Sequence, residues 1–268
     1  MFVGSIAADG TRIVRGTGFL VGTAADQAGE VHLHLVTASH VVRHDEPSFM
    51  RLRRLRSAVP EGVRLDEREL DEEVVDVDLG AWHRHPAADV AISLLRDTDD
   101  RWAVGVVMVD DFVDESEHEP YAGEDVFFAG LLAQVESMAE RHVPMLRGGM
   151  IGALHQRAIP MLEPGGARRL LDGHLIDCRS FGGFSGAPCF ARLVRPAPPT
   201  PRLGLVGTET HSLLLGMVGG HFDHRSSVEI LGDKLSIPTS AGVAVVYPCE
   251  LIRELLDDED LAAERCVD

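Results

Sequence analysis

The sequence predicts an all-β protein made of two six-stranded antiparallel β-barrels followed by a C-terminal helix. The chain has 268 residues, of which 45% are hydrophobic, enough for one large β domain or two barrels of ordinary size. Its 27 glycines and 14 prolines interrupt many short runs rich in Val, Leu, Ile and Phe, a pattern typical of β proteins. A polar connector divides these runs into two sets, and residues at helical spacing follow the second set.

The first set predicts one barrel within residues 1–112. Its six runs are 12–22, 31–38, 50–56, 74–82, 89–95 and 103–109. The acidic connector from Val109 to Asp125 ends this set. A second barrel, within residues 113–268, is expected from the runs 125–132, 142–150, 154–160, 168–177, 204–221 and 242–247. The glycines between Arg147 and Leu154 suit the strand bends that closing a barrel requires.

The segment from Pro248 to Glu264 predicts a single amphipathic helix docked on the second barrel. Proline fits the start of a helix, since its fixed φ is already helical there. The apolar face consists of Leu251, Ile252, Leu255 and Leu256.

The net charge of −18 disfavours binding to nucleic acid through phosphate neutralisation. One segment is an exception, since four of the six residues from Arg51 to Arg56 are arginines that alternate with leucine. This pattern indicates a strand with a solvated basic face, or alternatively a site for a polyanion. The acidic stretch from Leu65 to Asp78 is the expected neighbour that would screen the arginines.

No run approaches the roughly 18 apolar residues of a membrane helix, so no membrane contact is predicted. The first residues lack a basic segment followed by an apolar stretch, as a secretory signal would have, and a cytoplasmic protein is therefore expected. The cysteines show no Cys-x-x-Cys spacing, which argues against structural zinc and favours small buried hydrophobic side chains. These cysteines are Cys178, Cys189, Cys249 and Cys266.

The segment FGGFSGAPCF, from Phe181 to Phe190, suggests catalysis. Its Gly-x-Ser-Gly turn offers Ser185 as a nucleophile, and the N–H groups of Gly183 and Ser185 as donors to an oxyanion. A serine hydroxyl is a weak nucleophile unless a base and a group that orients the base accompany it.

Two residues upstream fit these roles. The apolar run HLVTASHVV places His40 just past a buried strand, as the candidate base. The run DVAISLL places Asp89 at the start of another core strand, as the candidate orienting group. The chain order of His, Asp, Ser matches the chymotrypsin order and neither the α/β-hydrolase nor the subtilisin order.

With these residues in place, the sequence resembles the trypsin-like (chymotrypsin-fold) serine proteases over most of its length, and among them the bacterial intracellular type. The segments that carry the resemblance are GTGFLVG (Gly16 to Gly22), TASH (Thr37 to His40), DVAISLL (Asp89 to Leu95), FSGAP (Phe184 to Pro188), LLLGMVGGHF (Leu213 to Phe222) and AGVAVVYPCELIRELL (Ala241 to Leu256).

The resemblance implies a serine endopeptidase that cleaves peptide bonds of a partner protein through an acyl-enzyme. His40 and Asp89 would come from the first barrel and Ser185 from the second, with the catalytic cleft between them. The substrate would be a protein or peptide, a regulatory partner protein is compatible with this reading, and no cofactor is implied. The alternative is a catalytically idle pair of barrels that serves as a protein-binding or sensor module.

The resemblance also implies a substrate-binding region. The strand from Leu213 to Phe222, including Gly219 and Gly220, would run beside the substrate backbone, and His221 would line the pocket for the residue before the cut. Arg179 would lie at the base of this pocket, where a cation favours an acidic side chain, unless the arginine turns to solvent.

Two departures from the secreted members bear on regulation. Phe184 stands where many of them have an aspartate that pairs with a newly cleaved N-terminus, so activation by clipping is not expected. The segment that includes Asp177 instead resembles stress proteases that are switched by loop ordering. A bridge between Cys178 and Cys189 would resemble a disulfide of secreted relatives, but it is not expected here.

Metal binding has little support in the sequence. His32 and His34 form one i,i+2 pair, and His83 and His85 form another, a spacing that can chelate a metal. Thirteen histidines make chance pairs common, and no third ligand is evident, so no metal site is predicted.

Overall fold

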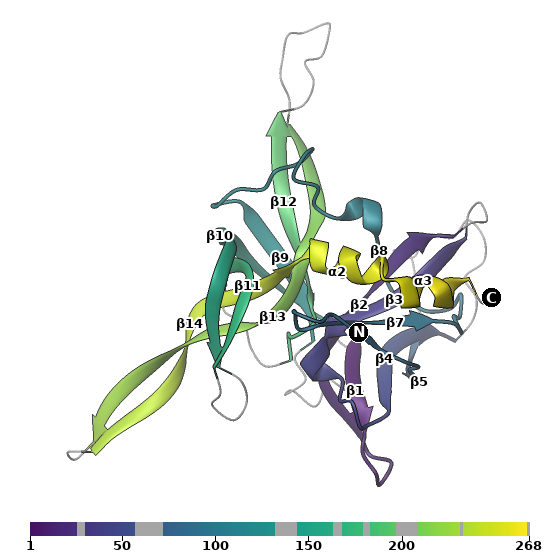
Figure 1. Ribbon diagram of the computed structural model, residues 1–268, viewed down its shortest axis with the longest axis horizontal. Helices are drawn as coiled ribbons and strands as arrows, with labels where there is room; N and C mark the ends of the chain where they lie inside the picture. The colour runs from purple at the N-terminus through teal and green to yellow at the C-terminus, as the bar shows by residue number, and fades with distance from the viewer. Residues whose placement is uncertain are drawn as a thin grey trace, which may run out of the picture.

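The computed structural model describes residues 1–25, 30–56, 72–131, 144–162, 168–178, 183–196, 208–230 and 233–266. Within these ranges the chain is mostly β, with two β units side by side and two short helices near the C-terminus (Figure 1). The predicted all-β class is therefore confirmed.

The first unit is an eight-stranded sheet in the described residues. Its strands are β1 (Phe2–Ile6), β2 (Arg12–Ala24), β3 (Val31–Ala38), β4 (Ser48–Leu55), β5 (Glu72–Asp78), β6 (His83–Arg84), β7 (Val90–Leu95) and β8 (Val106–Met108). They follow the order β5-β4-β1-β2-β3-β7-β6, and β8 pairs with β2 in parallel. The sequence predicted six antiparallel strands here. The count differs because β1 and β6 lie outside the predicted runs: Gly4 and Ser5 interrupt the apolar residues of β1, and β6 has only two residues.

The second unit is a closed barrel of six antiparallel strands, as predicted. Its strands are β9 (Asp125–Gly130), β10 (Met145–Leu162), β11 (Arg168–Asp177), β12 (Pro188–Pro196), β13 (Thr208–Ile230) and β14 (Asp233–Pro248). They close in the order β10-β11-β14-β13-β12-β9. The runs 142–150 and 154–160 form one strand, β10, because the chain bends at three register shifts between Ile151 and Ile159 instead of turning back. Strand β12 was not among the predicted runs.

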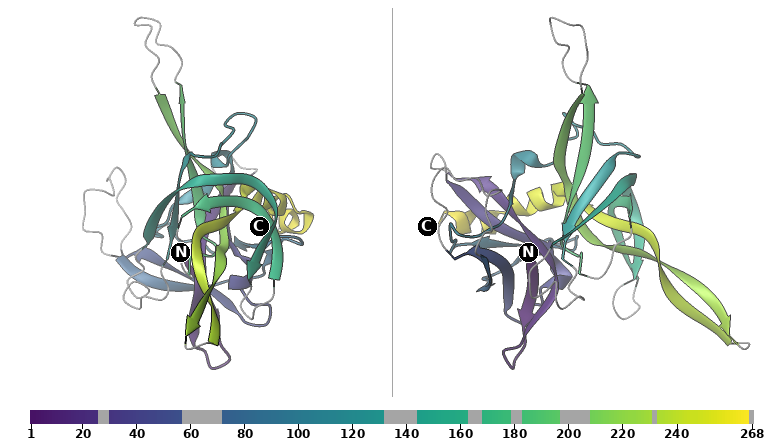
Figure 2. Two further views of the ribbon diagram at one scale, coloured as in Figure 1. Left: turned by 90° about the vertical axis from the view of Figure 1, so that its left-hand side faces the viewer. Right: turned by 180° about the vertical axis from the view of Figure 1, so that it is seen from behind.

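Strands β13 and β14 form a hairpin much longer than the sequence predicted. They pair from Gly216 with Pro248 out to Ile230 with Asp233, and the outer part projects from the barrel as a twisted ribbon (Figures 1 and 2). The predicted runs stopped at residue 221 and resumed at residue 242, since the sequence between them is too polar to show an apolar run.

The C-terminal segment forms two helices instead of one, α2 (Cys249–Leu256) and α3 (Glu259–Arg265). The break falls at Asp258, whose side chain accepts hydrogen bonds from the N–H groups of Asp260 and Leu261 and so caps a new helix. The helices also contact both units, because α2 packs on β13, β14 and β7 while α3 packs on β7 (Figure 1). The sequence predicted that the helix docks on the second barrel only, and this prediction missed the contacts of both helices with β7 in the first unit.

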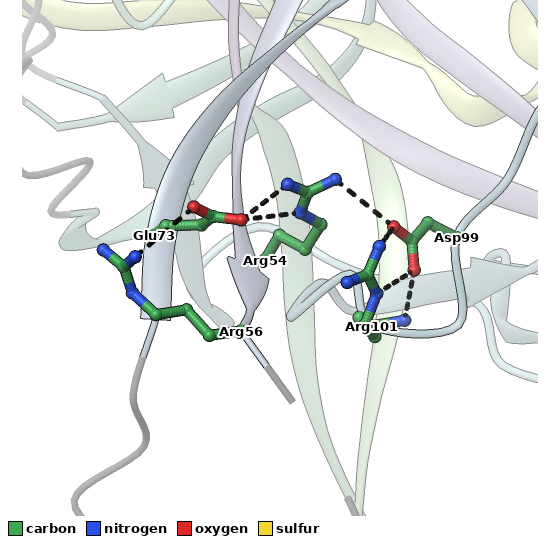
Figure 3. Close-up of polar contacts among 5 residues, drawn as sticks. All are labelled: Arg54, Arg56, Glu73, Asp99 and Arg101. Carbon is green, nitrogen blue, oxygen red and sulfur yellow. Dashed lines mark hydrogen bonds and ion pairs between the residues drawn. The ribbon is translucent and has the colours of Figure 1, made fainter. Parts of the chain in front are cut away.

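The arginine segment on β4 is neutralised by the acidic strand β5, as the sequence predicted. The two strands pair from Phe49 with Asp78 to Leu55 with Glu72, which brings each arginine within reach of a carboxylate on β5. The pairs are Arg51 with Asp76 at 2.6 Å, Arg53 with Glu72 at 2.8 Å, Arg54 with Glu73 at 2.5 Å and Arg56 with Glu73 at 3.7 Å. Figure 3 shows how Arg54 also reaches Asp99, which pairs with Arg101. A surface with its cations already paired offers little attraction to a polyanion.

Two buried histidines make the stability of the fold depend on pH. The His34 side chain on β3 is fully buried, and neither ring nitrogen has a partner among the described residues. Burial lowers the pKa of His34 from 6.5 to about 4, and mainly for the same reason the pKa of His174 also falls to about 4. Both folded-state pKa values lie below the unfolded value, so this stability is present above pH 6.5 and is lost as the pH falls toward 4.

We therefore expect the free energy of unfolding to decrease by about 2 kcal/mol per histidine between pH 7 and pH 5. Urea denaturation of wild type, His34→Leu, His174→Leu and the double variant at both pH values measures this. Each single variant should lose about 2 kcal/mol of the pH dependence and the double variant about twice as much, while the buried Met1 amine, whose pKa is lowered to about 5, keeps its own contribution. An unchanged pH dependence in the double variant would show that these imidazoles are protonated in the folded state.

Candidate active site

Strand pairing brings His40 and Asp89 together. His40 lies in a short 3-10 turn, Ser39–Val41, directly after β3, and Asp89 directly precedes β7. Strands β3 and β7 are antiparallel with Ala38 opposite Val90, so the end of one strand meets the beginning of the other. The Ser39 N–H extends this pairing by donating to the Asp89 backbone carbonyl at 3.1 Å.

Both carboxylate oxygens of Asp89 are engaged by His40. The Nδ1 atom of His40 lies 2.5 Å from Oδ2, and the His40 backbone N–H donates to Oδ1 at 2.8 Å. A carboxylate can only accept, so Nδ1 carries a proton, and in the neutral form of the ring the lone pair is then on Nε2. The Asp89 side chain is 10% exposed and that of His40 is 48% exposed, so a shielded anion orients a ring that solvent or a substrate can reach.

The loop that carries Ser185 needs glycine at two positions. Gly183 and Gly186 have φ values of +103° and +85°, which side chains with a Cβ rarely adopt. A Cβ on Gly186 would also lie 2.0 Å from the Thr17 carbonyl oxygen and 2.5 Å from Thr37 Oγ1. The loop therefore approaches the first unit as closely as a backbone can.

Thr17, a residue of β2, fastens this loop to the first unit. Its N–H donates to the Ser185 carbonyl at 2.9 Å, and its hydroxyl donates to the Gly183 carbonyl at 2.7 Å. The same hydroxyl accepts from the Leu131 N–H at 3.0 Å, and the Thr17 carbonyl accepts from Thr37 Oγ1 at 2.7 Å. Sequence reasoning missed this role, since the only signal was a threonine between two glycines in the run GTGFLVG.

The nucleophile loop and the histidine turn meet on β2 and β3. Gly186 packs against Thr37 and Ala38, which precede the turn, and a Cβ on Gly16 would meet both the Val41 side chain at 2.6 Å and the Ser185 carbonyl oxygen at 2.8 Å. Among the described residues, however, the Ser185 hydroxyl makes no hydrogen bond with His40. Such contacts are often long in proteins without substrate and tighten in the complex.

The two candidate oxyanion donors have no partner within the described part of the chain. The N–H groups of Gly183 and Ser185 donate to no acceptor there, whereas the neighbouring Gly186 N–H donates to the Val218 carbonyl at 2.8 Å and the Ala187 N–H to the Phe184 carbonyl at 2.9 Å. The Phe184 side chain is fully buried and packs edge-on against Phe128, which anchors the loop in the second barrel.

The candidate substrate-binding residues on β13 lie next to this loop. Val218, whose carbonyl accepts from Gly186, directly precedes Gly219 and Gly220, and the register with β14 shifts at this point. A Cβ on Gly219 would meet the Tyr247 ring at 2.4 Å, so close packing also requires glycine there. His221 follows on the same strand and is partly buried. Arg179 lies outside the described residues.

One of the two candidate pairs of metal ligands, His83 and His85, has other contacts. His83 lies 3.0 Å from Glu264, and His85 lies 3.0 Å from Glu254, so both bind the C-terminal helices. Within the described ranges no group of three or more potential ligand side chains comes together.

Three of the four cysteines are buried, as predicted, and Cys266 is the exception. Among the described residues none of the four forms a disulfide; Cys178, Cys189 and Cys249 are buried, whereas Cys266 is exposed. Burial raises the pKa of the Cys189 and Cys249 thiols well above the ordinary value, which agrees with the prediction of inert hydrophobic side chains.

In the described part of the chain no helix is both long and apolar enough to cross a membrane.

No family model and no curated protein matches the chain. Comparison with solved structures finds 21 matching chains, among them the crystal structure of the Rv3671c protease in its inactive form. That structure matches with a TM-score of 0.46 and 15% sequence identity, over 95% of this chain and 85% of that one. At this distance the likeness assigns no activity to this chain.

Proposed function

We propose that the chain is a trypsin-like serine endopeptidase that uses His40, Asp89 and Ser185. One observation carries the proposal: Asp89 holds the His40 ring by Nδ1 at 2.5 Å, beside a glycine-bounded loop that presents a serine. A shielded carboxylate that fixes a half-exposed imidazole next to a hydroxyl is the arrangement needed to activate that hydroxyl.

The proposed reaction begins when the Ser185 oxygen attacks the carbonyl carbon of a peptide bond and His40 Nε2 takes the hydroxyl proton. The charge that develops on the carbonyl oxygen would be stabilised by the N–H groups of Gly183 and Ser185, at about 3 kcal/mol per donor. His40 then gives the proton to the leaving amine, and an acyl-enzyme forms on Ser185. Water, deprotonated by His40, hydrolyses the ester and restores the serine.

A conformational step precedes this attack, because Ser185 and His40 share no hydrogen bond in the ligand-free chain. The backbone around Ser185 is held on two carbonyls by Thr17 and on the Gly186 N–H by Val218. A rotation of the Ser185 side chain is therefore a smaller change than a movement of the loop, and we assign the step to this rotation.

The cleft of this enzyme would lie between a unit of residues 1–112 and a unit of residues 113–268. The chain reaches the second barrel near this boundary, since Phe112 forms a β-bridge with Leu214 and the Val113 N–H donates to the Leu214 carbonyl at 2.9 Å. A protein or peptide would bind along β13, beside Gly219 and Gly220.

The alternative is a catalytically idle pair of β units that binds a partner protein. The absence of a hydrogen bond between Ser185 and His40 favours this alternative, because a catalytically idle fold needs no such bond.

Peptide cleavage distinguishes the two. The purified chain should cut a peptide mixture at neutral pH, producing new N-termini that are absent with His40→Ala, and peptides with Glu, Leu or Arg before the cut test the pocket. Binding of a partner protein together with no new N-termini in any mixture would support the idle module.

A further inference from the structure

Arg84 lies on β6 and binds the turn that carries His40. Its Nη1 donates to the Ser39 carbonyl at 2.8 Å and to Ser39 Oγ at 2.6 Å, and its Nη2 donates to the Val42 carbonyl at 2.8 Å. One guanidinium therefore joins the residue that precedes the turn's histidine to the residue that follows the turn.

Besides this guanidinium, the turn is held by Asp89, which accepts from the Ser39 and His40 N–H groups, and by one weak bond of its own. It is a single 3-10 turn, and its own closing hydrogen bond, from the Val42 N–H to the Ser39 carbonyl, is long at 3.3 Å. The N-terminal cap position, Ala38, has no side chain that could cap the turn. Three shorter, charge-assisted hydrogen bonds from Arg84 outweigh one long neutral bond.

We propose that Arg84 is a positioning residue that fixes the His40 turn so that Asp89 can hold the imidazole in its reactive orientation. The inference rests on the proposed function of this site. Strand pairing supports it, since Arg84 pairs with Ala91 on β7, only two residues beyond Asp89. Burial lowers the pKa of Arg84 while the charge of Asp89 opposes that shift, so the guanidinium also lies within electrostatic reach of the carboxylate.

Arginine is the residue this role requires. Its planar fork can donate to two carbonyls and a hydroxyl together, whereas the single ammonium of lysine cannot span the Ser39 and Val42 carbonyls in the same way. A cavity of about 230 Å³ adjoins the guanidinium, lined by Arg43, Glu46, Trp82 and Arg84 among others. The cavity does not include His40, Asp89 or Ser185, so Arg84 acts on the site from outside the catalytic cleft.

Steady-state kinetics of Arg84→Ala tests this role. We expect kcat to fall by about 10- to 100-fold, since a small misplacement of a catalytic group has effects of this size, while KM changes by less than about twofold. Arg84→Lys should recover part of kcat. Methylguanidinium at a non-denaturing concentration should enter the enlarged cavity and restore kcat of Arg84→Ala.

Arg43→Ala is the matched control, because Arg43 lines the same cavity but donates to Glu46 and not to the turn. This variant should keep the wild-type kcat and show no response to methylguanidinium. An active wild type together with an unchanged kcat in Arg84→Ala, or a loss of kcat that methylguanidinium and lysine both fail to reduce, would overturn the positioning role.

A second measurement does not depend on activity. The proton between His40 Nδ1 and Asp89 should give a strongly downfield ¹H NMR signal that disappears in Asp89→Asn. In Arg84→Ala this signal should broaden or move upfield, and in Arg43→Ala it should stay. If the signal responds in this way but wild type cleaves nothing, the proposed function is wrong and the positioning role stands. If the signal is identical in Arg84→Ala and wild type, the positioning role is wrong.

Discussion

Replacing Ser185 by alanine should lower kcat for peptide cleavage by a factor of about 10⁴ to 10⁶. The change removes the atom that forms the acyl-enzyme, so only binding and the oxyanion donors would still accelerate the reaction. The fold should be unaffected, because the Ser185 hydroxyl makes no hydrogen bond to the described residues, and the loop is held through its backbone and the Phe184 side chain.

Ser212→Ala serves as the matched control, since Ser212 is an exposed residue of β13. It should keep the wild-type kcat, and both variants should keep the wild-type midpoint in thermal unfolding. Substantial cleavage by Ser185→Ala would assign the activity to another residue or to a contaminating protease.

Asp89→Asn should lower kcat by a factor of about 10⁴. Asp89 accepts hydrogen bonds from His40 Nδ1 and from the His40 backbone N–H, and an asparagine offers only one acceptor oxygen for these two donors. If that oxygen stays on the backbone N–H, the amide NH₂ faces Nδ1 and forces the proton onto Nε2. The ring then has no lone pair directed at Ser185.

Initial rates with one peptide substrate, measured from pH 6 to pH 9, test this expectation. Asp97→Asn is the control for the loss of one negative charge, since Asp97 is exposed and lies just past the other end of β7. Only Asp89→Asn should lose activity across the range. Equal rates for the two variants would mean that Asp89 does not orient the base.

The pieces of the site were predictable because each follows a local pattern. His40 comes directly after one apolar run and Asp89 directly before another, and the pairing of β3 with β7 then brings the ends of these runs together. The arginine segment was predictable for a related reason. A basic run that is followed by an acidic run predicts that the two segments lie side by side, and β4 does pair with β5.

Features that depend on competition between local preferences were not predictable. Apolar spacing across residues 248–264 favours one helix, but the capping tendency of Asp258 starts a second one. The outer half of the β13–β14 hairpin carries no apolar run, so no pattern indicated a strand there.

The contacts of Arg84 and Thr17 could not be predicted either. Both side chains bind backbone carbonyls of distant residues, and backbone acceptors leave no trace in the amino-acid pattern. The absence of a hydrogen bond between Ser185 and His40 depends on side-chain conformation, which could not be predicted from the sequence.

Labelling with a fluorophosphonate probe tests most directly whether the imidazole activates the serine. Mass spectrometry of the intact protein and of its peptides should find one phosphonyl group, on Ser185, in wild type and in Ser212→Ala. Labelling should be absent in Ser185→Ala and slowed at least 10³-fold in His40→Ala, where the hydroxyl has lost its base. A folded wild-type chain that stays unlabelled, or carries the probe on another residue, would contradict the account.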